Sequence, residues 1–173
     1  MNQITSLFPQ SYESSRARFH DDLALVQQFW PQAELLEHKL PGAEELRIEW
    51  IAADALAENE KLLVFTTGEH GIEGYLGSAM MQRFIDCYLP RIDPQTTGLL
   101  LVHAIDPWGM KYKRRTNAGN VDLNRNFVWQ PELIDQEFNL ELRKIDKFVD
   151  PPRPVKGIRR TIRLSSGGGG QPR

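Results

Sequence analysis

The stretch that decides the fold runs from Lys61 to Gly74 and reads KLLVFTTGEHGIEG. Its first seven residues form a continuous apolar run that ends at Gly68, which is typical of a strand buried on both faces of a sheet. After it, apolar residues recur at the spacing of one helix face, at Ile72, Tyr75, Leu76, Ala79, Met80, Phe84 and Tyr88. The stretch therefore predicts a strand that leads directly into a helix.

The same alternation continues on both sides of this unit. Helical spacing predicts a helix over residues 12–30, and Leu46–Ala52 (LRIEWIA) alternates as a half-buried strand does. Leu99–Ile105 (LLLVHAI) predicts a second buried strand, and residues 131–149 again have helical spacing. Strands that alternate with helices predict an α/β domain with at least two parallel central strands.

Composition is that of an ordinary soluble protein. The chain has 173 residues, 40% hydrophobic and 25% charged, and its formal net charge of −2 gives no strong field to favour nucleic acid or an anionic membrane. Its single cysteine, Cys87, cannot form an intramolecular disulfide, and we expect an inert packed thiol. The first residues lack the pattern of a signal peptide, and no apolar run is long enough for a bilayer, so we expect a cytoplasmic protein.

Charge is unevenly distributed along the chain. All 23 acidic residues lie within residues 1–150, whereas residues 151–173 are basic and rich in proline and glycine. We predict a folded domain over residues 1–150 and a disordered tail over residues 151–173. A solvated tail, a tail that binds RNA or acidic partners, and unrelated sequence fused after a frameshift are the three interpretations of that composition.

A short loop after the strand at residues 61–67 contains His70 and Glu73. Residues three apart in helical geometry point the same way, so an imidazole and a carboxylate at this spacing can converge on one ion. Histidine nitrogen and carboxylate oxygen together suit zinc. The alternative is an exposed His–Glu pair that caps the start of the helix.

A longer loop follows the strand at residues 99–105. Residues 106–127 have no clear periodicity, and a loop of this length in a compact domain favours a functional role. Its arginines suit bidentate binding of a carboxylate, with a neighbouring asparagine to fix orientation. The alternative is a basic surface loop with an Asx turn.

Together the two loops carry a family resemblance. The order of H-G-x-E-G (residues 70–74), a strand, a P-x-G turn, R-x-N and V-D-L-N-R-N-F (residues 121–127) resembles the zinc carboxypeptidase family of metallopeptidases, and most of all its bacterial members of undefined substrate. The resemblance covers about residues 62–127. It implies a mixed, largely parallel central sheet flanked by helices. It also implies a zinc-dependent hydrolase acting on a peptide or acylamino acid with a free carboxylate.

The resemblance implies a role for each matching residue. His70 and Glu73 would be two of the three protein ligands of a catalytic zinc. Asp122 would accept a hydrogen bond from the imidazole of His70, although a residue of this type also forms turns. Asn124 and Arg125 would bind the terminal carboxylate of the substrate.

The remaining candidates are arginines and histidines. Arg115 would stabilise the oxyanion that develops on the scissile carbonyl, and Arg114 is the competing assignment because loop lengths differ among relatives. His103 lies inside a predicted strand and is expected to be a core histidine. His20 and His38 lie outside the resemblance and are expected at the surface.

The pattern of the family is incomplete after Phe127. The third zinc ligand, a downstream histidine, has no match, and neither do the later general-base glutamate and its tyrosine. We therefore expect the amino-terminal half of such an enzyme, with little peptidase activity of its own and a tendency to self-associate through uncovered apolar surfaces. The alternatives are an amidohydrolase that deacylates acylamino acids and a degenerate binding module without enzymatic activity.

Overall fold

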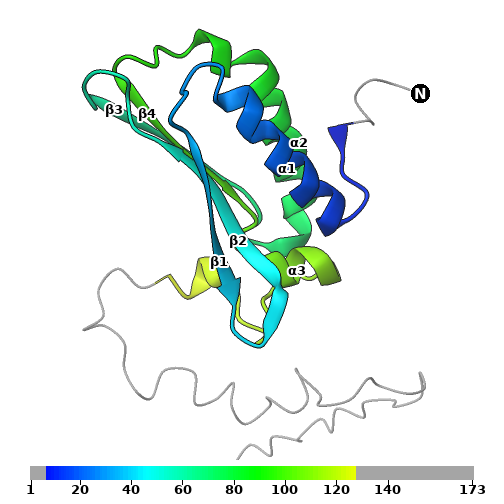
Figure 1. Cartoon of the computed structure of the whole chain (residues 1–173). Helices are drawn as coiled ribbons and strands as arrows, with labels where there is room; N and C mark the ends of the chain where they lie inside the picture. Colours follow the sequence, from blue (N-terminus) through cyan, green and yellow to red (C-terminus); the bar gives the residue numbers. More distant parts are fainter. Residues whose placement is uncertain (1–6, 128–173) are drawn as a thin grey trace, which may run out of the picture. The chain divides into compact units, whose positions relative to one another are not determined.

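A four-stranded sheet and the helices beside it make up most of residues 7–127, the part of the chain that the computed structural model describes (Figure 1). The helices and strands are α1 (Tyr12–Val26), β1 (Glu34–Leu40), β2 (Ala43–Ala53), β3 (Lys61–Thr66), α2 (Gly74–Cys87), β4 (Thr97–His103) and α3 (Pro107–Tyr112). Short 3-10 turns lie at Gly71–Glu73, Leu89–Arg91 and Leu123–Arg125. None of the described helices is long and apolar enough to span a membrane.

The described residues belong to one compact unit, Met1–Trp129, and Gln130–Arg173 form a second unit. The predicted helix at residues 131–149 and the predicted tail at residues 151–173 fall in the second unit, outside the described residues. The domain boundary at residue 150 therefore stays a prediction.

The strands lie in the order β1-β2-β4-β3, and the sheet is mixed. β3 and β4 run parallel, with Val64 beside Leu100, whereas β2 is antiparallel to both β1 and β4. The predicted α/β fold with a mixed sheet and flanking helices is confirmed. The sequence does not predict β1, because ELLEHKL has neither a continuous apolar run nor strict alternation.

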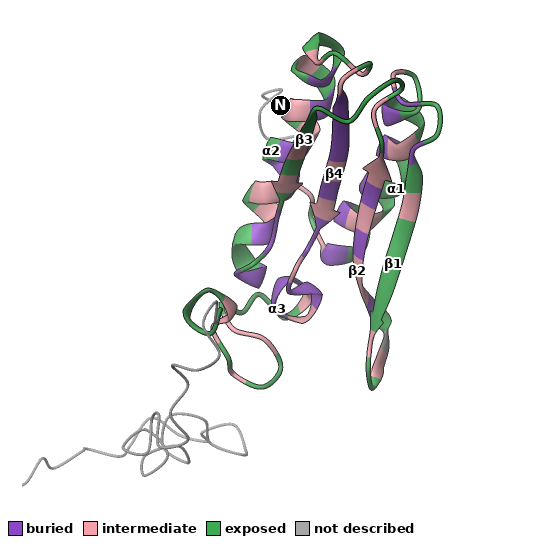
Figure 2. Ribbon diagram, turned by 90° about the vertical axis from the view of Figure 1, so that its left-hand side faces the viewer, coloured by how far each residue is buried: buried purple, intermediate pink, exposed green. Residues whose placement is uncertain are grey.

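Both long helices pack on one face of the sheet, and the main core lies between them and the strands (Figures 1 and 2). α1 begins with a capping box in which the side chains of Ser11 and Ser14 each accept a hydrogen bond from the other residue's amide. The buried apolar residues of the core are Phe19, Val26, Trp30, Ala33, Ile51, Met81, Ile85, Leu89, Leu99 and Leu101. The core therefore joins residues from the helices, β2 and β4.

The position of β3 differs from the prediction. Its continuous apolar run predicts burial on both faces, but β3 lies at one edge of the sheet, and Leu62 and Val64 are 63% and 52% exposed. They project from the face that neither long helix covers, because Leu63 and Phe65 pack into the core instead. Self-association through such exposed apolar residues stays a prediction.

The buried face of α2 also differs from the prediction. Helical spacing places Leu76, Met80 and Tyr88 on the predicted core face, yet each of them is more than half exposed. The buried residues of α2 are Gly74, Ser78, Ala79, Met81 and Ile85. Apolar residues occur on more than one side of this helix, so periodicity alone does not select the side that faces the sheet.

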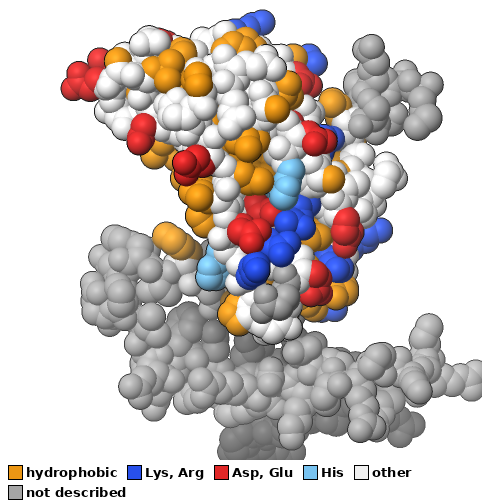
Figure 3. All heavy atoms as spheres, in the orientation of Figure 1, with side chains coloured by type: hydrophobic (Ala, Val, Ile, Leu, Met, Phe, Trp, Pro, Cys, Tyr) orange, Lys and Arg blue, Asp and Glu red, His pale blue; other side chains and the backbone are white. Residues whose placement is uncertain are grey.

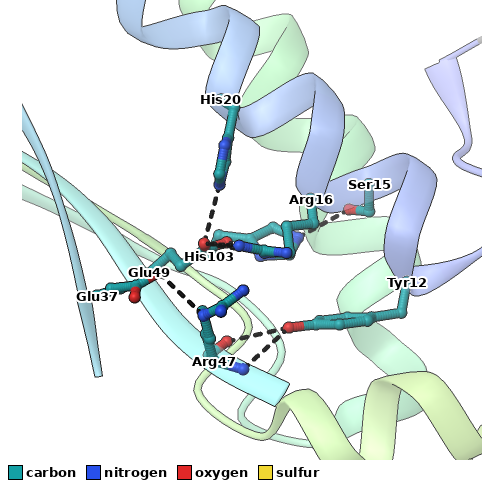
Figure 4. Close-up of polar contacts among 8 residues, drawn as sticks. All are labelled: Tyr12, Ser15, Arg16, His20, Glu37, Arg47, Glu49 and His103. Atoms are coloured by element: carbon teal, nitrogen blue, oxygen red, sulfur yellow. Dashed lines mark hydrogen bonds and ion pairs between the residues drawn. The ribbon is translucent and has the colours of Figure 1, made fainter. Parts of the chain in front are cut away.

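A buried carboxylate joins α1 to β2 (Figure 4). Glu49 accepts hydrogen bonds from Nε of Arg16 at 2.9 Å and from the ring of His20 at 2.8 Å, and its side chain is 1% exposed. Burial raises the pKa of Glu49, but the hydrogen bonds from Arg16 and His20 outweigh it and lower the pKa below its usual value. His20, expected at the surface, is exposed but directs its ring to this carboxylate.

His103 lies opposite Glu49 in the register of β2 and β4 and is 1% exposed, as expected for a core histidine. Its Nε2 is 2.9 Å from Oγ of Ser15, whose hydroxyl donates to Ser78 at 2.7 Å. The ring stacks on Phe19 with 5.3 Å between centroids. Burial lowers the pKa of His103 to about 4, so the imidazole is neutral at pH 7.

Acidic and basic side chains are intermixed on the surface next to this network (Figure 3). Lys111 is 3.4 Å from Glu13 and 3.9 Å from Glu45, and Arg47 is 3.0 Å from Glu37. Such partly exposed pairs each contribute little to stability. The buried bonds of Glu49 therefore matter more for the attachment of α1 than the ion pairs outside it.

Acidification is expected to destabilise the fold through His103. Its pKa is lowered from 6.5 to about 4, so between these values the unfolded chain binds a proton more tightly than the folded chain. The free energy of unfolding should fall by about 2 kcal/mol between pH 7 and about pH 4.5 because of this group. Urea denaturation at both pH values should show that His103→Gln lacks this part of the decrease.

The matched control is His38→Gln, which removes an exposed imidazole on β1. This variant should show the same decrease in the free energy of unfolding as the wild type. Glu49 should not obscure the comparison, because its pKa is lowered and its stabilising charge is lost only as the pH falls below the ordinary range of a glutamate. Equal decreases in the wild type and in His103→Gln would contradict the role of His103.

Candidate metal centre

The two loops singled out in the sequence meet beyond the carboxyl ends of β3 and β4. The amide of Ile105 donates to the carbonyl of Thr67 at 2.9 Å, and the amide of Asp106 donates to the carbonyl of Gly68 at 2.7 Å. Gly68 has a φ of 65°, in the left-handed region that glycine favours, and there the chain turns out of the sheet. Both loops therefore start from one edge, where parallel strands commonly place functional residues.

His70 and Glu73 face each other just before α2. Nδ1 of His70 lies 3.3 Å from Oε1 of Glu73. The His70 side chain is 9% exposed, whereas the Glu73 side chain is 61% exposed. His70 precedes the turn Gly71–Glu73 without a side-chain capping hydrogen bond, so the pair does not cap the helix in the way that the alternative interpretation requires.

The distance between these two atoms fits a shared zinc ion. Zinc bonds to histidine nitrogen and carboxylate oxygen are about 2.0–2.2 Å long, and a tetrahedral angle then separates two ligand atoms by about 3.4 Å. The observed 3.3 Å agrees with this spacing. Within residues 7–127, no group of three or more His, Cys, Asp or Glu side chains is arranged to hold a metal ion, so this part of the chain offers a two-residue donor set.

Asp122 links the longer loop to His70. Its Oδ1 is 3.0 Å from Nε2 of His70, and its Oδ2 accepts a hydrogen bond from Nε of Arg115 at 3.1 Å. Desolvation raises the pKa of Asp122, but the hydrogen bonds from His70 and Arg115 outweigh it and hold the pKa at about 2. In the tautomer with the proton on Nε2, the imidazole donates a hydrogen bond to the ionised Asp122, and Nδ1 is left as an acceptor on the side of Glu73.

Asp122 also forms the turn that sequence analysis considered as its alternative role. Its side chain accepts a hydrogen bond from the amide of Arg125 at 3.3 Å and so caps the turn Leu123–Arg125. The side-chain amide of Asn126 donates to its carbonyl at 2.9 Å. One residue therefore both shapes the V-D-L-N-R-N-F segment and contacts His70.

Of the two candidate arginines, Arg115 is the one whose side chain reaches the pair. One of its terminal nitrogens lies 3.9 Å from Oε1 of Glu73, and its side chain is 51% exposed. Arg114 contacts the first loop through its backbone, where its carbonyl accepts a hydrogen bond from the amide of Ile72 at 2.9 Å. The guanidinium of Arg115 thus has donors beside the candidate metal position.

A pocket of about 420 Å³ lies next to the pair. His70, Glu73 and Asn124 line its polar end, and the residues that line the rest are Thr66, Thr67, Gly68, Glu69, Leu76, Gly77 and Met80. Arg125 is exposed in the turn Leu123–Arg125 and does not line this pocket. The structure therefore brings Asn124, but not the predicted neighbour Arg125, to the pocket.

The contact that holds the two loops together is not predicted from the sequence. The backbone of Gly71 packs directly on Gly109, so that a Cβ atom added to Gly71 would lie 2.0 Å from the Gly109 carbonyl carbon. The hydroxyl of Tyr75 donates to the carbonyl of Met110 at 3.1 Å and strengthens the same contact. The signal in the sequence is the pair of glycines, one in H-G-x-E and one in P-x-G.

A family model covers most of the chain. Residues 8–153 match the model of DUF2817, described as a protein of unknown function. The chain belongs to the DUF2817 family. No protein in a search of curated proteins matches it.

This DUF2817 chain is also similar to solved structures. They include a candidate metallopeptidase from Shewanella denitrificans OS217 (20% identity, TM-score 0.48, covering 79% of this chain and 47% of that one). A metallo-carboxypeptidase from Burkholderia cenocepacia has 19% identity and a TM-score of 0.44, and the match covers 75% of this chain and 37% of that one. A candidate carboxypeptidase from Burkholderia mallei has 18% identity and a TM-score of 0.46, and the match covers 75% of this chain and 35% of that one. The DUF2817 chain thus spans less than half the length of these proteins.

Gly71→Ala is expected to separate the two loops. The added methyl group would meet the Gly109 backbone, which cannot rotate away as a side chain does, and overpacking of this kind costs about 1–3 kcal/mol. Urea denaturation should therefore show a clear loss of stability.

The matched control is Gly119→Ala in the longer loop, where the nearest atom, Oδ1 of Asn117, would be 3.4 Å from the new methyl group. This substitution should change the free energy of unfolding by less than about 0.5 kcal/mol. Similar losses in both variants would contradict the specific contact between Gly71 and Gly109.

Proposed function

We propose that this DUF2817 chain carries the metal-binding site of a zinc-dependent hydrolase of the carboxypeptidase type. One observation supports the proposal above all others: Nδ1 of His70 lies 3.3 Å from Oε1 of Glu73 while Nε2 of the same ring is held by Asp122 at 3.0 Å. A histidine that is oriented through one nitrogen and has the other beside a carboxylate has the arrangement expected of a zinc ligand.

In this proposal His70 and Glu73 hold the zinc ion. When bound, zinc supplies Lewis acidity, which polarises a carbonyl group and acidifies water. Asp122 keeps the proton of His70 on Nε2, so that Nδ1 stays available as a ligand atom. Arg115 is fixed by Asp122 through Nε, and its terminal nitrogens supply hydrogen bonds to the oxyanion that develops on the scissile carbonyl.

The substrate in this proposal is a peptide or acylamino acid with a free carboxylate. Asn124 and Arg125 bind that carboxylate, in keeping with the V-D-L-N-R-N-F resemblance. Asn124 already lines the pocket next to His70, whereas Arg125 must move its exposed side chain toward the substrate. An arginine suits this role because its planar guanidinium can donate two parallel hydrogen bonds to one carboxylate.

The chain is expected to bind zinc through His70. Calorimetric titration with zinc at pH 7 should show one site in the wild type and none in His70→Ala. Asp122→Asn should weaken zinc binding by about 10–100-fold, because loss of a partner that orients a metal-binding histidine has an effect of this size.

His38→Ala, which removes an exposed histidine on β1, is the matched control and should bind zinc as the wild type does. Equal zinc binding by His70→Ala would contradict the proposal. The same titration separates the metal centre from the alternative of a binding module without a metal.

Little or no peptidase turnover is expected from the purified 173-residue chain. In this proposal His70 and Glu73 supply two zinc ligands, and the sequence after Phe127 contains no histidine to complete the set of three that the resemblance to zinc carboxypeptidases implies. An assay with hippuryl-phenylalanine, with and without added zinc, checks this expectation. Zinc-dependent turnover that disappears in His70→Ala would show that a third ligand of another kind completes the site.

A further inference from the structure

One face of α2 continues from the metal pair into an apolar strip. Glu73, Leu76, Gly77 and Met80 are spaced i, i+3, i+4 and i+7, which places them on the same side of the helix. All four line the pocket that also contains His70 and Asn124. Seven residues of α-helix rise about 10 Å, so the strip extends about that far from the carboxylate of Glu73.

The middle of the strip is Gly77, where the absence of a side chain lets α2 approach Thr67 closely. Gly77 packs on Thr67, and a Cβ atom on it would lie 2.8 Å from Cβ of Thr67. Leu76 and Met80 stand on either side of this glycine along the helix and are 53% and 55% exposed. Leu76 and Met80 thus supply an apolar wall of the groove, the pocket to which His70, Glu73 and Asn124 contribute polar groups.

Such a pocket matches the general chemistry of small-molecule sites, in which apolar walls bind most of the ligand and a few polar groups orient it. The core of α2 is supplied by Met81 and Ile85 on another side of the helix. Leu76 and Met80 therefore lie outside the buried core of the described residues. They line the same pocket as His70 and Glu73.

We propose that this groove binds an extended apolar group of the substrate, about 10 Å long, attached at the carbonyl that faces His70 and Glu73. The inference rests on the proposed function and adds to it the class of substrate: amides whose acyl side is apolar. Two sources share this chemistry, namely a fatty acyl chain on an acylamino acid and a large apolar side chain in the residue before the scissile bond.

Binding of matched ligands to the full chain tests the proposal. The first pair is N-octanoylglycine and N-acetylglycine, and the second is acetyl-phenylalanyl-glycine and acetyl-glycyl-glycine. All four end in glycine with a free carboxylate, so each pair differs only in its apolar group. Calorimetry should show at least tenfold tighter binding of the apolar member of one pair, and the pair with the larger ratio identifies the source.

The double variant Leu76→Ser, Met80→Ser should reduce that ratio to less than about threefold, a change of about 0.7 kcal/mol or more in relative binding free energy. Both residues are exposed, so the fold should be retained, which the far-ultraviolet circular dichroism spectrum checks. The matched control is Val64→Ser, which removes an apolar side chain of similar exposure on the helix-free face of the sheet. This control should keep the full ratio.

Ratios below twofold for both pairs in the wild type would overturn the inference, and so would a ratio that survives in the double variant. An affinity ratio that is lost in Val64→Ser and kept in the double variant would place the apolar group of the ligand on the sheet, and this would also overturn the inference. The measurement is made with and without zinc. If the wild type shows the affinity ratio but does not bind zinc, the proposed metal centre alone is contradicted. If it binds zinc but shows no affinity ratio, the apolar groove alone is contradicted.

Discussion

The parallel pairing of β3 with β4 decides where every candidate functional residue lies. Because Thr66 pairs with Val102, the two strands end side by side and their following loops leave the sheet together. Gly68 and Ala104 then take left-handed conformations, with φ of 65° and 54°. For alanine this conformation is uncommon, and the hydrogen bond that the Ala104 amide donates to Oγ1 of Thr67 at 3.2 Å helps to hold it. The constraint brings Asp122 within reach of His70 across 52 residues of sequence.

The same three kinds of side chain occur together twice in this molecule, with different consequences. Glu49 binds Arg16 and His20 on the inner side of α1, and Asp122 binds Arg115 and His70 beside the pocket. The Glu49 side chain is 1% exposed and ties a helix to the sheet. In the second group the second ring nitrogen of His70, Nδ1, faces another carboxylate, that of the exposed Glu73, beside a pocket.

Local patterns in the sequence predicted the parts of the site that depend on spacing along the chain. His70 and Glu73 are three residues apart, and the expected approach of their side chains is found, although His70 has extended backbone and the 3-10 turn Gly71–Glu73, not a continuous α-helix, brings them together. The proximity of Asp122 and Arg115 to the pair of His70 and Glu73 followed only from the family resemblance, since no local pattern relates the longer loop to residues so far away in the sequence. The contact of Gly71 with Gly109 was missed because two glycines indicate a close backbone approach only after the fold is known.

The error in the predicted face of α2 and the inferred groove have the same physical origin. The helix has more apolar residues than its contact with the sheet uses, so periodicity counts Leu76 and Met80 with the core. Leu76 and Met80 are instead about half exposed and line the pocket beside the pair, where apolar walls are common in ligand-binding sites. Since both residues share a helix face with Glu73, the same element that orients the carboxylate also shapes the apolar wall beside it. In the proposed function, the turn that carries Glu73 and the helix that follows it would then contribute both a metal ligand and the apolar wall.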